Sequence, residues 1–278
     1  MNESPNHEIE RVIEIARAAT AVVRGVYESG FDVELKGPND PVTRADREAN
    51  ALICSELARA FPADAVVAEE SAPTSQEEIA RLVAAPRVWF VDPLDGTREF
   101  TERIGEFAVM IGLAVGGKAT LGVVPLPTTG ELLVGRVGAG AFVEAADGTR
   151  TPLAVSKVGA PAEATLMVSR SHRPPVVAPF TAALGITRLV PCGSVGVKVS
   201  RIANGSADLY VHGARGAKRW DTCAPEAILV AAGGRFTDLR GEPIDYARPT
   251  LAQTGGILAS NALLFDAARA VTRTIEDP

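Results

Sequence analysis

The chain has 278 residues, of which 46% are hydrophobic and 22% are charged, and its formal net charge is −6. This composition is typical of a globular protein and excludes the fibrous and disordered classes, and the negative charge excludes a general electrostatic attraction to nucleic acid. The length is sufficient for two domains, each with a core of its own.

The start of the chain is polar and acidic, and no apolar run reaches the ~18 residues needed to span a bilayer. The three cysteines, Cys54, Cys192 and Cys223, are scattered, so their spacing favours neither a disulfide framework nor a zinc site. We therefore expect a cytoplasmic protein with no nucleic-acid partner and no membrane partner. The sequence leaves a monomer and a homodimer both open.

Two helices are predicted in the first sixty residues. Apolar residues recur at helical spacing over residues 9–26, and Gly30 follows as a plausible C-terminal cap. After an expected loop at residues 35–42, Thr43 can cap a second helix, which Pro62 stops. Lys36 lies in that loop, and we consider it a candidate for a mobile element near the site described below, with an ordinary surface charge as the alternative.

Short apolar runs at residues 65–70 and 87–94 are rich in β-branched and aromatic residues and predict buried strands. Over residues 107–144, apolar runs alternate with glycine-containing turns, which is typical of an antiparallel meander. Beyond about residue 160, strand and helix patterns alternate. We therefore predict an α/β protein with an α+β half at residues 1–160 and an α/β half at residues 161–278.

Two aspartates stand at the carboxyl end of the second predicted strand. Asp92 and Asp95 flank Pro93, which fixes φ, and they precede Gly96, which permits a sharp turn. The segment can therefore direct both carboxylates and the Leu94 carbonyl toward one point. Clustered hard oxygens suit Mg²⁺.

Further acids can join this cluster from other segments. Glu69 and Glu70 end the preceding strand, and Asp221 opens a predicted helix. Such like charges repel one another unless a metal neutralises them. An ordinary acidic turn is the alternative for the D-x-x-D-G-T pattern by itself. Its spacing, and the lack of a Ser–His or Cys–His signature, favour activated water over a covalent intermediate.

Four motifs in this order resemble those of the inositol monophosphatase superfamily of Mg²⁺-dependent, lithium-sensitive phosphatases, and the resemblance covers roughly residues 9–270. The motifs are DPVTRAD from Asp40, VAEES from Val67, WFVDPLDGTREF from Trp89 and WDTCAPEAILVAAGG from Trp220. The 3'(2'),5'-bisphosphate nucleotidase branch is the most similar, through DGTREF, VSRSH at 168–172 and GSVGVK at 193–198. This resemblance implies a layered α/β/α/β/α sandwich of the sugar phosphatase type.

The resemblance also implies roles for individual residues. It implies two or three Mg²⁺ ions held by Glu69, Asp92, Asp95, Asp221 and the Leu94 carbonyl. Asp46 and Thr97 are implied to prepare the attacking water, since Thr97 can orient it and pass its proton to Asp46. Contacts to a nucleotide are implied for Thr97, Ser169, His172, Ser194, Gly196 and Lys198.

Within that set, Lys198 is the expected partner of a 5'-phosphate, and the backbone at residues 193–196 can add an anion site if it opens a helix. Residues 1–160 are then the metal-binding domain and residues 161–278 the nucleotide-binding domain. We predict a phosphatase that hydrolyses the 3'-phosphate of adenosine 3',5'-bisphosphate to AMP and phosphate, with 3'-phosphoadenylyl sulfate as a further candidate substrate. An inositol phosphatase and a catalytically silent metal- or nucleotide-binding protein remain as alternatives.

Overall fold

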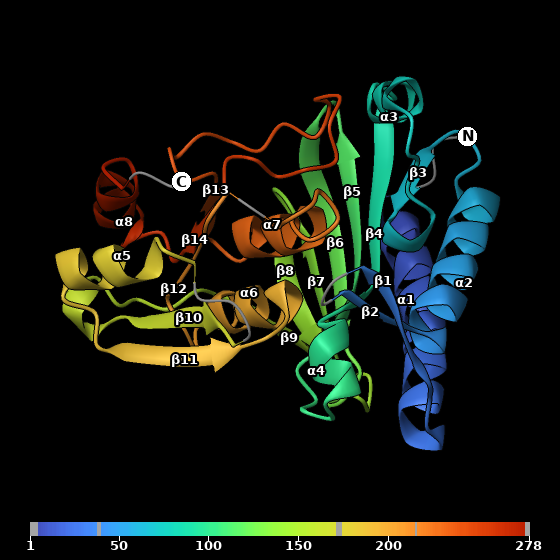
Figure 1. Cartoon of the computed structure of the whole chain (residues 1–278), viewed down its shortest axis with the longest axis horizontal. Helices are drawn as coiled ribbons and strands as arrows, with labels where there is room; N and C mark the ends of the chain where they lie inside the picture. The colour runs from blue at the N-terminus through green and yellow to red at the C-terminus, as the bar shows by residue number, and fades with distance from the viewer. Residues whose placement is uncertain (1–4, 38–39, 171–173, 215, 276–278) are drawn as a thin grey trace.

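The structure is a computed structural model that describes residues 5–37, 40–170, 174–214 and 216–275. Two β-sheets stand side by side, with helices between them and on both outer faces (Figure 1). The order of the layers is α/β/α/β/α, which confirms the fold class predicted from the sequence.

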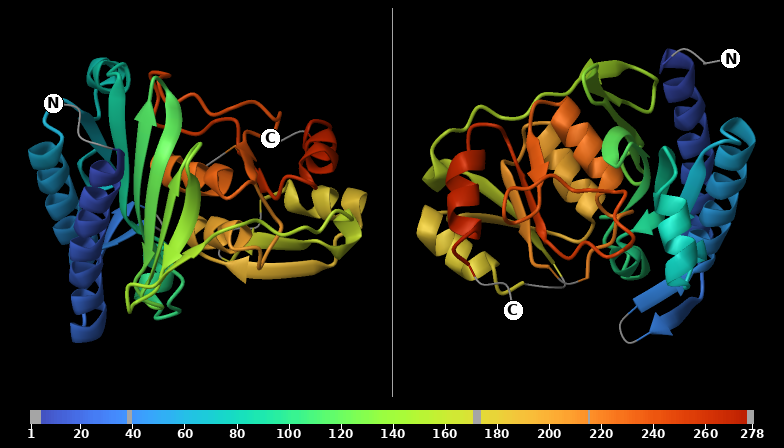
Figure 2. Two further views of the ribbon diagram at one scale, coloured as in Figure 1. Left: turned by 180° about the vertical axis from the view of Figure 1, so that it is seen from behind. Right: turned by 90° about the horizontal axis from the view of Figure 1, so that it is seen from above.

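The first layer consists of α1 (Pro5–Ser29) and α2 (Arg44–Ala60), which cover the outer face of the larger sheet (Figure 2). Their apolar stripes bury residues such as Ile13 and Ile53 completely. Gly30 follows α1 with φ at +88°, and Thr43 caps α2, so both predicted helix boundaries are confirmed.

A short hairpin lies where the sequence predicts a loop. It consists of β1 (Val33–Gly37) and β2 (Asp40–Thr43), which pair in antiparallel fashion. The side chains of β1 are almost all exposed, and Leu35 keeps 68% of its surface accessible. Because neither face of β1 is buried, the sequence carries no alternation of apolar and polar residues that could indicate a strand.

The larger sheet has seven strands in sequential order, and it confirms the predicted buried strands and meander. β3 and β4 are parallel, and every later pair is antiparallel. The strands are β3 (Ala65–Ala68), β4 (Arg87–Asp95), β5 (Ala108–Val115), β6 (Lys118–Leu126), β7 (Glu131–Arg136), β8 (Gly140–Glu144) and β9 (Arg150–Pro152). Three short helices precede or follow β4, namely η1 (Glu69–Ser71), α3 (Gln76–Val83) and α4 (Thr97–Thr101).

The smaller sheet has five strands in the order β11-β10-β12-β14-β13. They are β10 (Thr165–Ser169), β11 (Arg188–Cys192), β12 (Leu209–His212), β13 (Arg235–Thr237) and β14 (Ile257–Ser260), and η2 (Pro161–Glu163) precedes them. The helices α6 (Val195–Ala203) and α7 (Cys223–Ala231) lie between the two sheets, and α5 (Val177–Leu184) and α8 (Phe265–Thr272) cover the far face (Figure 1).

The predicted boundary near residue 160 falls in the segment that connects the two sheets. One hydrophobic cluster nevertheless continues across it, because Phe90 and Met110 of the first half and Met167 and Ile228 of the second belong to the same core. The division into two domains with separate roles stays a prediction. Among the helices in the described ranges, none is both long enough and apolar enough to cross a membrane.

A row of glycines lets α7 lie directly on the larger sheet. Gly112, Gly122 and Gly135 occupy facing positions on β5, β6 and β7. A Cβ atom at Gly122 would lie 2.2 Å from the Ala224 carbonyl oxygen, and one at Gly135 would lie 2.4 Å from Cα of Ile228. Only glycine fits at such a distance, so these three positions determine how closely α7 approaches the sheet.

Candidate active site

Four acidic residues from three segments of the chain gather between the larger sheet and the helices α6 and α7. Glu69 begins η1, directly after β3, and Asp92 and Asp95 end the neighbouring strand β4. Asp221 lies in the turn before α7. Burial, together with the charges of Glu69, Asp95 and Asp221, raises the pKa of Asp92 well above its usual range. The four carboxylates therefore lie close enough for their charges to act on one another.

The same causes act on the other members of this carboxylate cluster. Burial, with the charges of Asp95 and Glu69, raises the pKa of Asp221 well above its usual range. Burial also raises the pKa of Glu69, where Lys36 opposes the effect, and that of Asp95. Asp92 is only 3% exposed, whereas the other three carboxylates are partly exposed. The cluster is thus a concentration of negative potential that solvent can reach, which favours a cation.

Asp95 connects the two halves of the molecule. Its Oδ2 accepts hydrogen bonds from the Ser194 hydroxyl and, at 2.7 Å, from the backbone N–H of Gly196. Both donors lie at the N-terminus of α6, where backbone N–H groups lack partners within the helix. The Ser194 hydroxyl also caps α6 by accepting from the N–H of Val197 at 3.0 Å.

Asp46 and Thr97 are hydrogen-bonded to each other across 51 positions of sequence. Asp46 forms a capping box with Thr43 at the start of α2, which leaves its Oδ1 to accept from the Thr97 hydroxyl at 3.1 Å. The same hydroxyl lies 3.0 Å from the Leu94 carbonyl oxygen. Burial raises the pKa of Asp46, although the hydrogen bonds from Thr43 act in the opposite direction.

Lys36 reaches the carboxylate cluster from the β1–β2 hairpin. Its ammonium donates to Glu70 at 2.6 Å and to Glu69 at 3.1 Å. Burial acts against its charged form, but the two carboxylates hold the pKa of Lys36 above its usual range. The hairpin therefore brings a positive charge to the acidic strand end, and the role of Lys36 in a mobile element stays a prediction.

Lys198, the expected partner of a 5'-phosphate, is turned away from solvent in this structure. Its side chain is completely buried, and its ammonium donates to the carbonyl oxygens of Gly193 at 2.7 Å and Cys192 at 3.1 Å. The ammonium also lies 5.1 Å from the centre of the Tyr210 ring. Lys198 here stabilises the turn that leads into α6, and its contact with a 5'-phosphate stays a prediction.

The other residues predicted to contact the nucleotide differ in their hydrogen-bond partners and in their exposure to solvent. Ser194 and Gly196 direct their polar groups to Asp95, as described above, rather than to an open surface. Ser169 ends β10 and is partly exposed. His172 lies outside the described residues.

The carboxylate cluster has the donors that Mg²⁺ prefers, namely hard oxygens from four acids with the Leu94 carbonyl beside them. In the ranges that the structure covers, no three Asp, Glu, His or Cys side chains surround one common point. Each carboxylate instead accepts from a donor of its own. Asp92 accepts from the Leu94 N–H at 2.9 Å and Asp221 from the Lys218 N–H at 2.7 Å, whereas Lys36 and α6 hold the other two.

Sequence reasoning missed a polar network behind Asp221. The Tyr246 hydroxyl donates to Glu226 at 2.7 Å and lies 3.1 Å from the Thr222 hydroxyl, one residue after Asp221. Arg219 is buried beside this network, 5.6 Å from the Tyr246 ring centre. The signal that could have indicated it is an acid, Glu226, within an otherwise apolar helix.

Sequence reasoning also missed Glu106, which fixes the turn before α6. Its carboxylate accepts from the Gly193 N–H at 3.1 Å and from the Arg170 guanidinium at 2.7 Å. No spacing in the sequence connects residues so far apart. The layered fold, and a buried carboxylate cluster between its halves, are the features expected of the superfamily that the four motifs indicate.

Comparison with known proteins agrees with the superfamily that the four motifs indicate. The model of the inositol monophosphatase family matches residues 6–276. The chain therefore belongs to the inositol monophosphatase family.

Among its relatives, human 3'(2'),5'-bisphosphate nucleotidase 1 is 33% identical over 281 residues, which cover 88% of each chain. The 3'(2'),5'-bisphosphate nucleotidase CysQ of Escherichia coli K12 is 34% identical over 240 residues, which cover 86% of this chain and 93% of the relative. The solved structure of an inositol monophosphatase from Anabaena (Nostoc) sp. PCC 7120 superposes with a TM-score of 0.77 at 26% identity and covers 98% of this chain and 97% of that one. The resemblance to the bisphosphate nucleotidase branch is thus confirmed.

Proposed function

We propose that this protein is a Mg²⁺-dependent phosphatase that hydrolyses the 3'-phosphate of adenosine 3',5'-bisphosphate to AMP and phosphate. The observation that carries the proposal is the Asp46–Thr97 hydrogen bond beside a cluster of four carboxylates, of which Asp92 is buried. This arrangement combines a proton acceptor with a site for cations, which metal-assisted hydrolysis requires. The choice of substrate rests on the names of relatives that are 33% and 34% identical over most of the chain.

Glu69, Asp92, Asp95, Asp221 and the Leu94 carbonyl are the groups that would hold Mg²⁺. When bound there, Mg²⁺ supplies a lowered pKa for a coordinated water and compensates the charge of the phosphate. The α6 N-terminus fixes the orientation of Asp95, and the Leu94 N–H fixes that of Asp92. These hydrogen bonds fix the two carboxylates, and binding of Mg²⁺ would require the four acids to turn toward a common point.

Thr97 and Asp46 move the proton in the proposed mechanism. The Thr97 hydroxyl donates to Asp46 Oδ1, so its oxygen is free to accept a hydrogen bond from the attacking water. As the water oxygen bonds to phosphorus, its proton passes to Thr97 Oγ1, and the Thr97 proton passes to Asp46 Oδ1. The raised pKa of Asp46 makes it a stronger proton acceptor than an exposed aspartate. The bond from phosphorus to the 3'-oxygen breaks in line, and no phosphoenzyme forms.

We infer that the reaction removes a by-product of sulfate assimilation in the cytoplasm. The sulfated nucleotide, 3'-phosphoadenylyl sulfate, is a further candidate because it carries the same 3'-phosphate. An inositol phosphate is the second candidate substrate, which the fold similarity to a solved inositol monophosphatase favours.

The test is phosphate release by the purified protein from adenosine 3',5'-bisphosphate and from inositol 1-phosphate, with Mg²⁺ or with EDTA. We expect release only with Mg²⁺, and a kcat/KM about 100-fold higher for the nucleotide, because a site built for its polar groups rejects a substrate that lacks them. A higher kcat/KM for the inositol ester would replace the proposed substrate. No release from either compound would favour a catalytically silent binding protein.

A further inference from the structure

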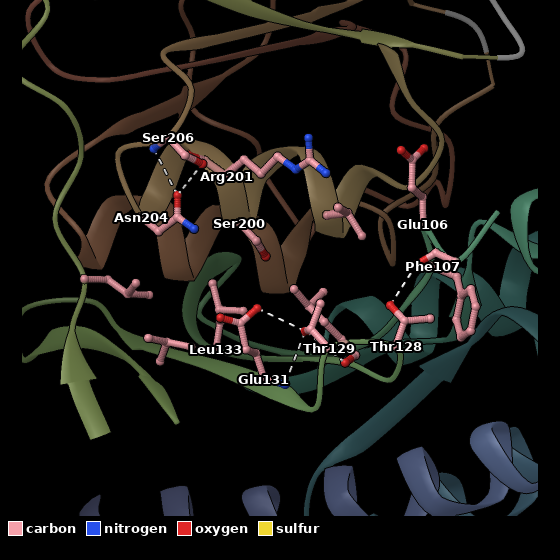
Figure 3. A pocket seen from close by; sticks show the side chains of 15 residues that line it. Glu106, Phe107, Thr128, Thr129, Glu131, Leu133, Ser200, Arg201, Asn204 and Ser206 are labelled. Atoms are coloured by element: carbon pink, nitrogen blue, oxygen red, sulfur yellow. Dashed lines mark hydrogen bonds between the residues drawn. The ribbon is translucent and has the colours of Figure 1, made fainter. Parts of the chain in front are cut away.

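A cavity of about 260 Å³ lies between α6 and the larger sheet, away from the carboxylate cluster (Figure 3). Its upper wall is the side of α6 that carries Ser200 and Arg201, and its lower wall includes Thr128, Thr129 and Leu133. Ser194 and Gly196, which hold Asp95 at the start of α6, are not part of the lining. The cavity is therefore a space distinct from the proposed active site.

The α6 wall presents hydrogen-bond donors that have no partner within the described ranges. Ser200 is only 4% exposed, yet its hydroxyl, which points into the cavity in Figure 3, makes no hydrogen bond there. The guanidinium of Arg201 likewise makes no hydrogen bond or ion pair with the described residues, and Arg201 lines the same space. A buried hydroxyl without a hydrogen-bond partner is costly unless a ligand or solvent satisfies it.

Asn204 adds a third donor whose orientation is fixed. Its Oδ1 accepts from the Ser206 N–H at 3.0 Å and from the Ser206 hydroxyl at 2.7 Å. A backbone N–H can only donate, so this contact identifies the oxygen of the amide. The amide NH₂ is then the group left for the cavity, where Figure 3 shows it on the side of Ser200.

The acidic residues of the lining, by contrast, already have partners. Glu106 accepts from Arg170 and from the Gly193 N–H, and Glu131 Oε2 accepts from the Thr129 hydroxyl at 3.0 Å. Burial acts against ionisation of Glu106, but these hydrogen bonds and the nearby charge of Arg201 hold its pKa below the usual range. The α6 wall thus offers donors without hydrogen-bond partners, whereas the Glu106 acceptors are engaged, so a ligand that supplies acceptors fits this wall.

The remaining surface of the cavity is apolar. Leu126, Leu133, Leu153 and Val197 each keep no more than 9% of their surface exposed and contribute to the lining. A cavity of about 150 Å³ is enough to hold a benzene molecule, so this one has room for a compact apolar body and a charged group. Leu133 lies on the wall opposite the α6 donors, whereas Val197 belongs to α6 itself.

We propose that this cavity is a binding site for a small organic anion, whose carboxylate, sulfonate or phosphate group pairs with Arg201 and accepts from Ser200 and Asn204. A guanidinium pairs with such groups through two parallel hydrogen bonds, which also orient the ligand. The apolar part of the ligand packs on the leucines below. The site does not depend on the proposed catalytic activity.

The test uses 4-fluorobenzenesulfonate as the probe, with binding followed by fluorine NMR on the full chain in EDTA. Wild-type protein is expected to bind it saturably with a Kd on the order of 1 mM, and Arg201→Gln is expected to bind about tenfold more weakly. Arg44→Gln, which removes an exposed arginine on α2, is the matched control and should bind as wild type does.

Asn204→Asp is the second variant and guards against an effect on folding. Aspartate keeps the oxygen that Ser206 contacts, so α6 keeps its end, but the added negative charge repels the probe. We expect weaker binding with an unchanged melting temperature. The proposal is overturned if the wild-type protein shows no saturable binding, or if Arg201→Gln and Asn204→Asp both bind with wild-type affinity.

Discussion

At the scale of single residues, the hydroxyl of Thr97 has one proton and two acceptors, Asp46 Oδ1 at 3.1 Å and the Leu94 carbonyl at 3.0 Å. The proton can satisfy only one of them at a time. In the proposed mechanism it faces Asp46, because that direction leaves a lone pair for the water. The position therefore requires a hydroxyl and not merely a side chain of this size.

Thr97→Val tests this requirement, since valine has nearly the same shape but no hydroxyl. We expect kcat to fall by about 100-fold or more, the contribution typical of a positioned proton-transfer group, and Thr97→Ser to retain most of the activity. Thr101→Val in the same helix is the control, because it removes a hydroxyl that only contacts the Arg98 carbonyl. Equal rates for the two valine variants would exclude Thr97 from proton transfer.

Glu226 is a residue whose charge state the fold controls. Burial raises its pKa to about 8, although the Tyr246 hydroxyl and Arg219 act in the opposite direction. Between the unfolded pKa of about 4.3 and this folded value, the folded state holds a proton that the unfolded state has lost. The stability that this proton contributes is therefore complete below the unfolded pKa, and it is lost as the pH rises from that value through the folded pKa.

Glu226→Gln removes this titration while keeping the shape of the protonated acid. We expect the free energy of unfolding of the variant, relative to wild type, to increase with pH by up to about 1.4 kcal/mol per unit between pH 5 and pH 8. Urea unfolding at several pH values measures the difference, with the exposed Glu163→Gln as the control. A difference that does not change with pH would contradict the protonated state of Glu226.

At the scale of secondary-structure elements, α6 combines a structural cap with a functional contact. Ser194 caps the helix through the Val197 N–H and at the same time donates to Asp95. The cap is a local feature that the sequence could suggest, whereas the contact joins residues 99 positions apart. The orientation of Asp95, a proposed metal ligand in the first half of the molecule, therefore depends on the start of α6 in the second half.

Ser194→Ala separates the two roles when it is compared with Ser75→Ala. Ser75 caps α3 in the same manner, through the Glu78 N–H at 3.2 Å, but we place it outside the proposed site. Each variant should lose about 1 kcal/mol of stability in urea unfolding. Only Ser194→Ala should also lose activity, by about tenfold, because Asp95 loses a donor that orients it. Unchanged kcat/KM in Ser194→Ala would show that this contact does not position Asp95.

At the scale of the whole molecule, the approach of α7 to the larger sheet depends on the glycine row at Gly112, Gly122 and Gly135. The helix begins two residues after Asp221. A displacement of α7 from the sheet therefore moves Asp221 relative to Asp92 and Asp95, which β4 carries. The distance between the halves and the geometry of the carboxylate cluster are set by the same contact.

Gly122→Ala is expected to lower the free energy of unfolding by about 1–3 kcal/mol, the usual cost of overpacking a core, because the added methyl meets backbone atoms of Ala224 that cannot yield. Activity should fall with it. Gly25→Ala in α1 adds the same methyl where no atom lies within 4 Å, and it should stabilise the protein by roughly 0.5–1 kcal/mol. Equal stability of the two variants would refute the role of the glycine row.

Much of the fold could be predicted because the signals are local. The stripe of α1, the cap of α2 and the apolar runs of β3 and β4 each depend on residues that are neighbours in sequence. The exposed strand β1 could not be predicted, since it has no buried face. The burial of Lys198 was missed for a related reason, because a lysine in a helix is usually solvated and its acceptors here belong to the preceding turn.

The sequence by itself determined the elements, the acidic residues at their ends and the family, because periodicity, caps and ordered motifs are carried by short segments. Only the tertiary structure decided that Asp95 is held by α6, that Lys198 is buried and that donors on α6 face a cavity. These features join segments up to about a hundred positions apart. The register of the strands and the close packing of α7 on the glycine row bring such segments together. No local sequence pattern encodes that geometry.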